Sequence, residues 1–180
     1  MKILIFVLLL IPIFISSYNL FIIQNVIDPI KYIYTFTGVI SVVLLFFTIL
    51  ITLIKKYVNL LKYRRMIGLF GFFYAFLHFL NFIVLDAQFD IHFIFKETTK
   101  KPFIYLGMIA FILLLFMALT STKKLFRKYN KFHKVIYLAL LLITIHLIIA
   151  QKSLDIYQMF YVLLIIIIGC FKLLQQVRKY

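Results

Sequence analysis

The chain has 180 residues, of which 66% are hydrophobic, and it carries a formal net charge of +15 with only 5 acidic residues. A soluble domain of this composition would expose too much apolar surface, which excludes the soluble globular classes. The single cysteine, Cys170, excludes an intramolecular disulfide and a cysteine-rich metal cluster.

Apolar runs of about 20 residues recur along the chain, and each is long enough to cross a bilayer as a helix. The connections between them are short, which leaves no room for a second, soluble domain. We therefore expect an all-α membrane protein built as a bundle of six transmembrane helices. The six segments lie at about residues 3–23, 35–54, 66–85, 102–120, 134–150 and 155–171.

The first segment, "MKILIFVLLLIPIFISSY", has the positive start, the apolar stretch and the small residues of a signal peptide. Its apolar character, however, continues through residues 20–23. This continuation favours a first transmembrane helix that is not cleaved.

Charge is distributed unevenly over the connections. The second-to-third and fourth-to-fifth connections and both ends of the chain carry basic residues and no acidic ones. By the positive-inside rule, we expect these regions, including both termini, to be cytoplasmic. Basic loops beside a membrane attract anionic headgroups, so this charge predicts contact with membrane lipid and not with nucleic acid. The acidic residues, all in the other connections, are Asp28, Asp86, Asp90, Glu97 and Asp155.

Histidines occur within two of the apolar segments, and an ionisable residue in hydrocarbon is by default a candidate functional residue. His78 lies 12 residues after Met66, the start of its segment, which places it roughly 18 Å into a core about 30 Å thick. His146 lies 13 residues after His133, the start of the fifth segment, and is roughly 20 Å deep. Both segments run outward, so we expect the two imidazoles at nearly the same depth.

Two neutral imidazoles at one depth could supply both axial ligands of a haem iron. A bis-histidine site has no open coordination position and suits electron transfer better than oxygen chemistry. The alternative is that each histidine bonds separately to a backbone carbonyl or a hydroxyl group in the bundle, and the spacing leaves both interpretations open. Zinc or copper is disfavoured, because the third and fifth segments contain no Cys, Asp or Glu to complete a site.

His133 lies at the cytoplasmic edge of the fifth segment, in "RKYNKFHKVIY". It is either an interfacial histidine in a basic loop or a ligand to a second, inner haem. The third segment has no histidine at that depth, but Arg64 and Arg65 could pair with haem carboxylates there. On an ideal helix, 13 residues turn His133 about 140° away from His146. The second axial ligand of an inner haem is therefore left unassigned.

Three further residues have simpler interpretations. His92, in the outer connection "AQFDIHFIFKETTKK", is expected at the membrane interface and not as an iron ligand. Gly68 and Gly71 are small enough for another helix or a flat macrocycle to approach closely, and ordinary helix packing explains them equally well.

Several stretches resemble a known family. "YRRMIGLFGFFYAFLHFLNFIVLD" resembles the third-helix signature of the MsrQ family, the haem-binding membrane subunits of the bacterial periplasmic methionine-sulfoxide reductase system. The resemblance extends from about Asp28 to His146, and the second-helix stretch shares the pair Thr37 and Gly38. The wider relatives are the ferric reductase-like transmembrane domains. The other matching stretches are "DPIKYIYTFTGVISVVLLFFTILIT", "KKPFIYLGMIAFILLLFMALTSTKKLFRKY" and "KFHKVIYLALLLITIHL".

The resemblance implies b-type haem, one or two per chain, with His78, His146 and His133 as iron ligands. The wider relatives share the 13-residue histidine spacing and have a further histidine where this chain and MsrQ-like proteins have Arg64. Flavin mononucleotide is implied by the resemblance only. The implied electron donor is the quinol pool or a cytoplasmic flavin reductase. The implied acceptor is a periplasmic, molybdenum-dependent methionine-sulfoxide reductase that repairs oxidised proteins.

We therefore expect residues 1–27 to form the first helix and its outer connection, 28–150 a ferric reductase-like haem core, and 151–180 the sixth helix and a basic cytoplasmic tail. The chain would be a multi-pass, inner-membrane electron-transfer subunit with no complete catalytic site of its own. Two alternatives are a transmembrane ferric reductase, or other haem-dependent electron carrier, and a haem-free membrane scaffold or transporter.

The charge distribution gives a test of topology. A reporter fused after Tyr180 is expected to be active in the cytoplasm, and one inserted near Thr98 is expected to be active outside, because basic connections stay on the cytoplasmic side. Paired fusions with a reporter specific for each compartment measure this. The opposite pattern would reverse the direction of electron flow.

Overall fold

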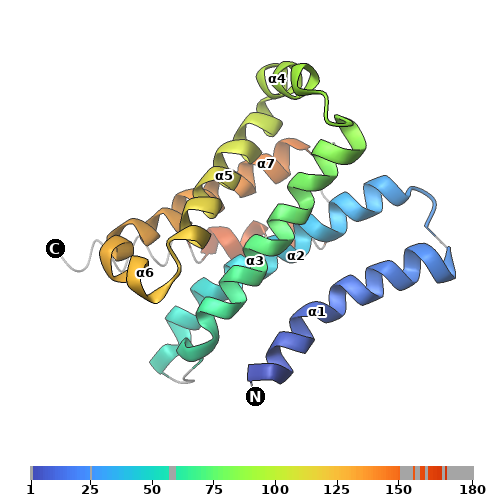
Figure 1. The fold of residues 1–180 in the computed structure, drawn as a ribbon. Coiled ribbons are helices and arrows are strands. Elements are labelled where there is room, and N and C mark those ends of the chain that lie inside the picture. Colours follow the sequence, from blue (N-terminus) through green and yellow to red (C-terminus); the bar gives the residue numbers. More distant parts are fainter. Residues whose placement is uncertain are drawn as a thin grey trace.

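The computed structural model describes residues 2–24, 26–56 and 60–150, together with 156, 159, 160, 162–167 and 169. All regular structure in these residues is helical, as expected for an all-α protein (Figure 1). The α-helices are α1 (Lys2–Tyr18), α2 (Pro29–Leu53), α3 (Leu61–Asn81), α4 (Ile91–Lys100), α5 (Pro102–Leu119), α6 (Lys123–Tyr129) and α7 (Ile136–Ala150). Short π-helical segments lie at Asn19–Ile23 and Phe82–Asp86, and 3-10 segments at Ile54–Lys56 and Asn130–Val135.

Five stretches of the described chain are long and apolar enough to cross a membrane, which fits a multi-pass membrane protein. The sixth expected segment, 155–171, lies largely outside the described residues, so the count of six helices stays a prediction. The five stretches are Lys2–Ile23, Pro29–Leu53, Leu61–Asp86, Pro102–Leu119 and Lys123–Ala150.

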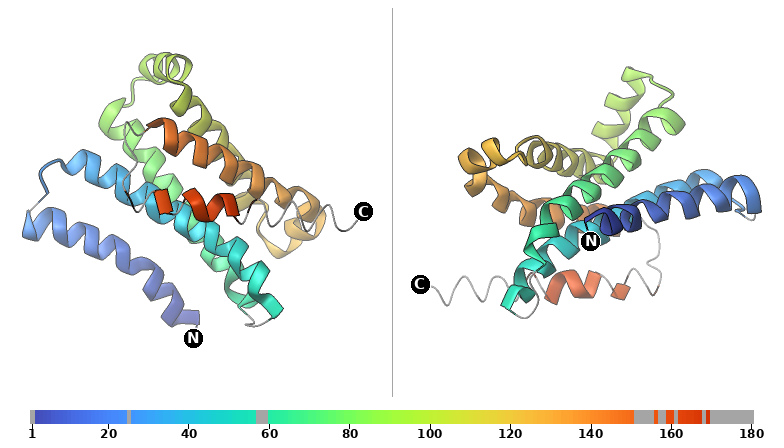
Figure 2. Two further views of the ribbon diagram at one scale, coloured as in Figure 1. Left: turned by 180° about the vertical axis from the view of Figure 1, so that it is seen from behind. Right: turned by 60° about the horizontal axis from the view of Figure 1, so that its bottom comes forward.

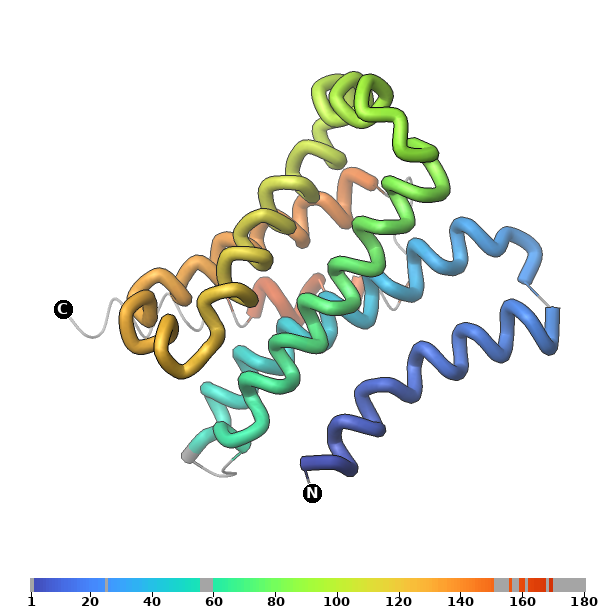
Figure 3. Tube along the Cα trace, in the orientation of Figure 1, coloured from blue at the N-terminus to red at the C-terminus, as the bar shows by residue number. Residues whose placement is uncertain are grey.

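Two helix pairs form the centre of the bundle. Helix α2 packs along α3, and α5 packs along α7 (Figure 3). The pairs meet where α3 contacts α5 and α2 contacts α7, while α1 lies outside, against α2 and α3 (Figure 2). Their side chains form two apolar clusters. One is centred on Leu45, Leu114 and Leu140 and joins the pairs, and the other, centred on Leu9 and Ile67, holds α1.

The two ends of the bundle differ in charge. The connection between α2 and α3 lies at the same end as α6, whereas α4 and the connection between α1 and α2 lie at the other end (Figure 1). The basic and the acidic connections, which alternate along the sequence, therefore lie at opposite ends of the bundle. Which end faces the cytoplasm stays a prediction.

Helix α2 begins at Pro29, six residues earlier than expected from the apolar run. The Asp28 side chain accepts a hydrogen bond from the Lys31 N–H (3.0 Å), and proline at the first helical position has no N–H to satisfy. Capping extends this helix beyond its apolar part, into the boundary region.

The outer connection contains a helix, α4, that hydrophobicity alone did not identify. Asp90 caps it, because its carboxylate accepts hydrogen bonds from the N–H groups of His92 (2.8 Å) and Phe93 (3.2 Å). Helix α4 is ten residues long and amphipathic, and therefore too short and too polar to span a bilayer.

Polar side chains within the spans are satisfied locally, as hydrocarbon requires. The hydroxyl groups of Thr48 and Thr144 donate to carbonyls of their own helices. Ser41 donates instead to the Gly71 carbonyl (2.9 Å) and so links α2 to α3. The Tyr74 hydroxyl donates to the Leu9 carbonyl (2.8 Å) and links α3 to α1.

Replacing this last link tests how α1 is held. Tyr74→Phe removes a fully buried hydroxyl and one inter-helix hydrogen bond, so the free energy of unfolding in mild detergent is expected to fall by about 0.5–1.5 kcal/mol. Tyr105→Phe is the matched control, because Tyr105 is 55% exposed. Equal losses in both variants would show that the hydrogen bond does not hold α1.

Candidate haem-binding site

The structure brings His78 and His146 together. His78 lies on α3 and His146 on α7, so each helix pair contributes one imidazole. Their ring centres are 6.2 Å apart and their planes are nearly perpendicular, at 89°. The two helices therefore place the imidazoles at one level of the bundle, as the equal depths in the sequence predict.

Each imidazole is held through the same nitrogen. His78 Nδ1 lies 3.1 Å from the Tyr34 carbonyl oxygen, and His146 Nδ1 lies 2.6 Å from the Phe103 carbonyl oxygen. A carbonyl can only accept, so Nδ1 carries the hydrogen in both rings and donates it. The lone pair of each neutral ring is then on Nε2, which is the tautomer a metal-binding histidine needs.

A large pocket surrounds the two rings. It has a volume of about 1020 Å³ and is lined by residues of α2, α3, α4, α5 and α7, including both histidines. This volume is at the upper limit of ordinary cofactor pockets, and a mostly apolar wall with a few convergent polar groups is typical of them. Its apolar wall includes Val39, Val42, Phe79, Phe111, Leu114 and Ile143.

The residues present fit a haem ligated by two histidines. Bonds from a metal to an imidazole nitrogen are about 2 Å long, so one metal between two Nε2 atoms holds the ring centres about 6 Å apart. The observed separation of 6.2 Å agrees with this. Hydrogen bonds from each histidine to a backbone carbonyl are also what the alternative without a haem predicts. They engage Nδ1, however, and are therefore compatible with ligation of a metal through Nε2.

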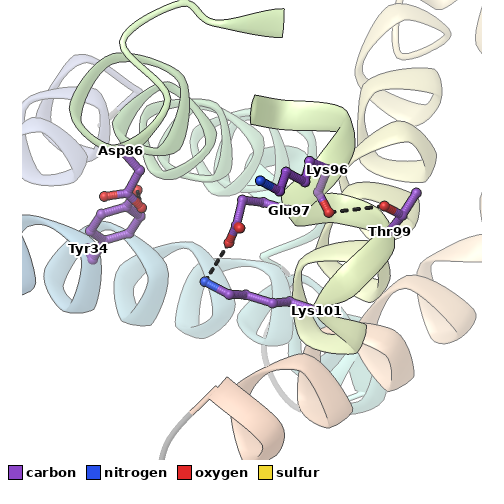
Figure 4. A network of polar contacts seen from close by, with 6 residues as sticks. All are labelled: Tyr34, Asp86, Lys96, Glu97, Thr99 and Lys101. Carbon is purple, nitrogen blue, oxygen red and sulfur yellow. Dashed lines mark hydrogen bonds and ion pairs between the residues drawn. The ribbon is translucent and has the colours of Figure 1, made fainter. Parts of the chain in front are cut away.

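One part of the pocket lining, here called its rim, is charged and polar, and Figure 4 shows four of its residues: Tyr34, Asp86, Glu97 and Lys101. The Tyr34 hydroxyl donates to the Asp86 carboxylate (2.7 Å), and Lys101 forms an ion pair with Glu97. Lys31 lines the rim as well. Two lysines at the mouth of an apolar pocket could hold the carboxylates of a haem.

A second, smaller pocket contains the residues expected at the inner site. Its volume is about 320 Å³, and Arg64, Arg65 and His133 all line it. The Arg65 Nε–H donates to the Ser121 hydroxyl (3.2 Å). The three residues are therefore brought together, in a space about a third as large as the pocket around His78 and His146.

The expected geometry of His133 on a regular fifth helix is wrong. His133 lies in the 3-10 segment Asn130–Val135, and α7 begins only at Ile136, so the angle computed for an ideal α-helix does not apply. Its Nε2 lies 3.0 Å from the Thr120 hydroxyl, which itself donates to the Phe116 carbonyl. His133 Nε2 therefore donates, and in this arrangement the lone pair is on Nδ1.

Outside these pockets, the described residues offer little else for a metal. His92 is exposed on α4 and lines neither pocket. Among the described residues, no group of three or more His, Cys, Asp or Glu side chains could hold a metal ion.

Two glycines contact the histidines, although the sequence analysis named Gly38 only as part of the family resemblance and did not name Gly107. A Cβ atom built on Gly38 would lie 3.1 Å from His78 Nδ1, and one built on Gly107 would lie 2.9 Å from His146 Nδ1. The glycines it did single out pack helices, since a Cβ on Gly71 would meet Leu45 at 2.9 Å. The sequence contains a signal that could have identified them, because an aromatic residue precedes each histidine-facing glycine by four positions, in "YTFTG" and "FIYLG".

Comparisons with known proteins identify the family of the chain. The family model described as "Ferric reductase like transmembrane component" matches residues 37–168. The protein-methionine-sulfoxide reductase heme-binding subunit MsrQ of Brucella anthropi is 37% identical over 132 residues, which cover 70% of this chain and 60% of the relative. The subunits of the same name from Brucella ovis and Brucella canis are 36% identical with the same coverage.

The chain thus spans about 60% of the length of these curated relatives. No solved structure matches it. The family model covers well over half of the chain, including both pockets' histidines, and on this ground the chain belongs to the ferric reductase-like transmembrane component family.

Proposed function

We propose that this chain is a transmembrane electron-transfer subunit that binds b-type haem through His78 and His146. The observation that carries the proposal is the pair of imidazoles 6.2 Å apart, each held through Nδ1 so that Nε2 is available. The printed name of the relatives, a heme-binding subunit, supports the identity of the cofactor.

The chain's own residues would bind and orient the cofactor. Haem supplies reversible one-electron chemistry at its iron when it is bound. His78 and His146 together would leave no open coordination position, which favours electron transfer over oxygen chemistry. The apolar wall, with Phe79 and Phe111 stacked at 4.4 Å between ring centres, would exclude water from the site.

The direction of transfer is part of the proposal. The protein would lie in a bacterial inner membrane with its basic end in the cytoplasm. Electrons would come from the quinol pool or a cytoplasmic flavin reductase and pass to a periplasmic, molybdenum-dependent methionine-sulfoxide reductase. The relatives' name supports a role with such a reductase. The inner pocket at His133, Arg64 and Arg65 would hold a second haem or flavin mononucleotide.

A second candidate function is a transmembrane ferric reductase, which the description of the matching family favours. The purified protein, once reduced, would then pass electrons to a ferric chelate without a partner subunit. A haem-free scaffold or transporter is the third candidate, and a colourless, iron-free preparation from haem-replete cells would favour it.

Histidine variants test the assignment of ligands. His78→Ala and His146→Ala are each expected to remove the outer haem, because one imidazole cannot supply both axial bonds and the surrounding wall is apolar. His133→Ala is expected to spare the outer haem and to affect only an inner cofactor. Haem content per protein and reduced-minus-oxidised spectra measure both effects.

His92→Ala is the control, since His92 is exposed and lines neither pocket. If His133→Ala removed all haem while His146→Ala retained it, the outer pair would be wrongly assigned.

The lysines at the rim give a separate test. Lys101→Gln is expected to lower haem affinity a few-fold, because a partly exposed ion pair with a haem carboxylate is worth about 0.2–1 kcal/mol. Lys96→Gln, on α4 and outside the pocket lining, is the control. Titration with haem and with its dimethyl ester measures the effect. A lysine effect of the same size with the ester would contradict carboxylate binding.

A further inference from the structure

We infer that Gly38 and Gly107 are positioning residues, which uncover two helix carbonyls so that these carbonyls can orient His78 and His146. The inference rests on the proposed haem function, which it deepens. It starts from the short distances between the glycine positions and Nδ1 of the facing ring, 3.1 Å at Gly38 and 2.9 Å at Gly107 for an added Cβ.

Helix geometry explains why a glycine favours contact between an imidazole and these carbonyls. In an α-helix the carbonyl of residue i accepts from the N–H of residue i+4, and it has a second lone pair free. Every Cα–Cβ bond tilts toward the N-terminus, so the side chain at i+4 covers the carbonyl at i. A side chain at i+4 does not exclude every donor, since the Tyr74 hydroxyl reaches the Leu9 carbonyl past Ile13, but it restricts the approach of a flat ring such as an imidazole.

Both histidines use a carbonyl of this kind. His78 bonds to the carbonyl of Tyr34, four residues before Gly38. His146 bonds to the carbonyl of Phe103, four residues before Gly107. The arrangement therefore occurs twice, once in each helix pair, on helices that are not consecutive in the chain.

The residue that supplies each carbonyl also contacts the imidazole with its ring. The Tyr34 ring lies edge-on to His78, with centres 5.5 Å apart, and the Phe103 ring lies 5.9 Å from the ring centre of His146. Aromatic residue and glycine, four positions apart, thus form one seat that fixes both the tautomer and the tilt of the imidazole.

Ordinary helix packing does not account for these two glycines, although it accounts for others. A Cβ on Gly71 would meet the side chain and the backbone nitrogen of Leu45, and one on Gly68 would meet Thr48 at an ordinary 3.4 Å. At Gly38 and Gly107 the three nearest atoms all belong to the imidazole. The absence of a side chain at Gly38 and Gly107 therefore makes room for the imidazole and does not serve the packing of one helix on another.

The seat has a chemical consequence for a bound metal. A hydrogen bond from Nδ1–H to a carbonyl raises the basicity of the ligating nitrogen and fixes the ring, and loss of such a bond typically costs about 10–100-fold in metal affinity. A more basic ligand favours the ferric state, so weakening the bond is expected to raise the midpoint potential.

The experiment compares alanine variants of the glycines in the purified full chain. Gly38→Ala and Gly107→Ala are expected to fold, to bind haem about 10–100-fold more weakly and to show an upward shift of the midpoint potential. The larger change is expected at Gly107, where the contact is closer. Haem titration, low-temperature electron paramagnetic resonance and redox titration measure these effects.

Two matched variants on α3 separate positioning from packing. Gly71→Ala is expected to lower stability and leave the potential of the retained haem unchanged, because Gly71 faces Leu45. Gly68→Ala, whose Cβ would meet Thr48 at 3.4 Å, is expected to change neither stability nor the potential of the haem on His78 and His146; Gly68 lines only the smaller pocket. If Gly38→Ala and Gly107→Ala behaved like Gly71→Ala, with a normal potential and resonance spectrum, the inference would be overturned.

A second experiment tests the inference if the glycine variants fail to fold. Histidine methylated on Nδ1, incorporated at position 146, removes the donor and leaves Gly107 in place. The same upward shift of potential is expected, and an unchanged potential overturns the inference.

Failure of the proposed function looks different, because the unaltered chain would then bind no haem. Nitrogen resonances of the two imidazoles in the haem-free chain would still test the inference. If the resonance of the protonated Nδ1 changes in Gly38→Ala and Gly107→Ala, the inference is supported. If neither variant alters the resonances of the two rings, the inference is refuted.

Discussion

The structure depends on how an imidazole is satisfied in hydrocarbon. A buried Nδ1–H without an acceptor would cost free energy, and no water is available within the bilayer core. The acceptors are the backbone carbonyls of Tyr34 and Phe103, on the helices that pair with those carrying the histidines. This type of bond links α3 to α2 and α7 to α5. It also determines which ring nitrogen can face a cofactor.

The sequence predicted that His78 and His146 lie at one level of the bundle, because rise per residue and charge-defined helix ends suffice for that. It did not predict the partners of Nδ1, because these depend on the register between two helices, which hydrophobicity leaves undetermined. Glycine positions carry part of that information. Gly71 and Gly107 are both helical glycines in apolar surroundings, however, and only the facing side chain distinguishes packing from positioning.

Departures from the expected fold occur where polar interactions, and not hydrophobicity, decide the backbone. Asp28 begins α2 six residues before its apolar run, and Asp90 begins α4, which no apolar run reveals. In both cases the carboxylate accepts hydrogen bonds from N–H groups of the first turn. Residues 130–135 form a 3-10 segment at the basic end, between α6 and α7. Apolar runs therefore located the described spans, while capping residues and short irregular segments set their ends.

The two pockets differ in how their histidines are prepared. In the larger pocket, backbone carbonyls engage Nδ1 of both rings, so the chain's own fold selects the tautomer that ligates through Nε2. In the smaller pocket, the Thr120 hydroxyl engages Nε2 of His133, and ligation through that nitrogen would require the ring to leave this partner. Arg64 and Arg65 also bring positive charge to the smaller pocket, whereas the rim of the larger one carries both signs. The larger site is therefore built by the backbone, and the smaller site by side chains whose charge favours an anionic group.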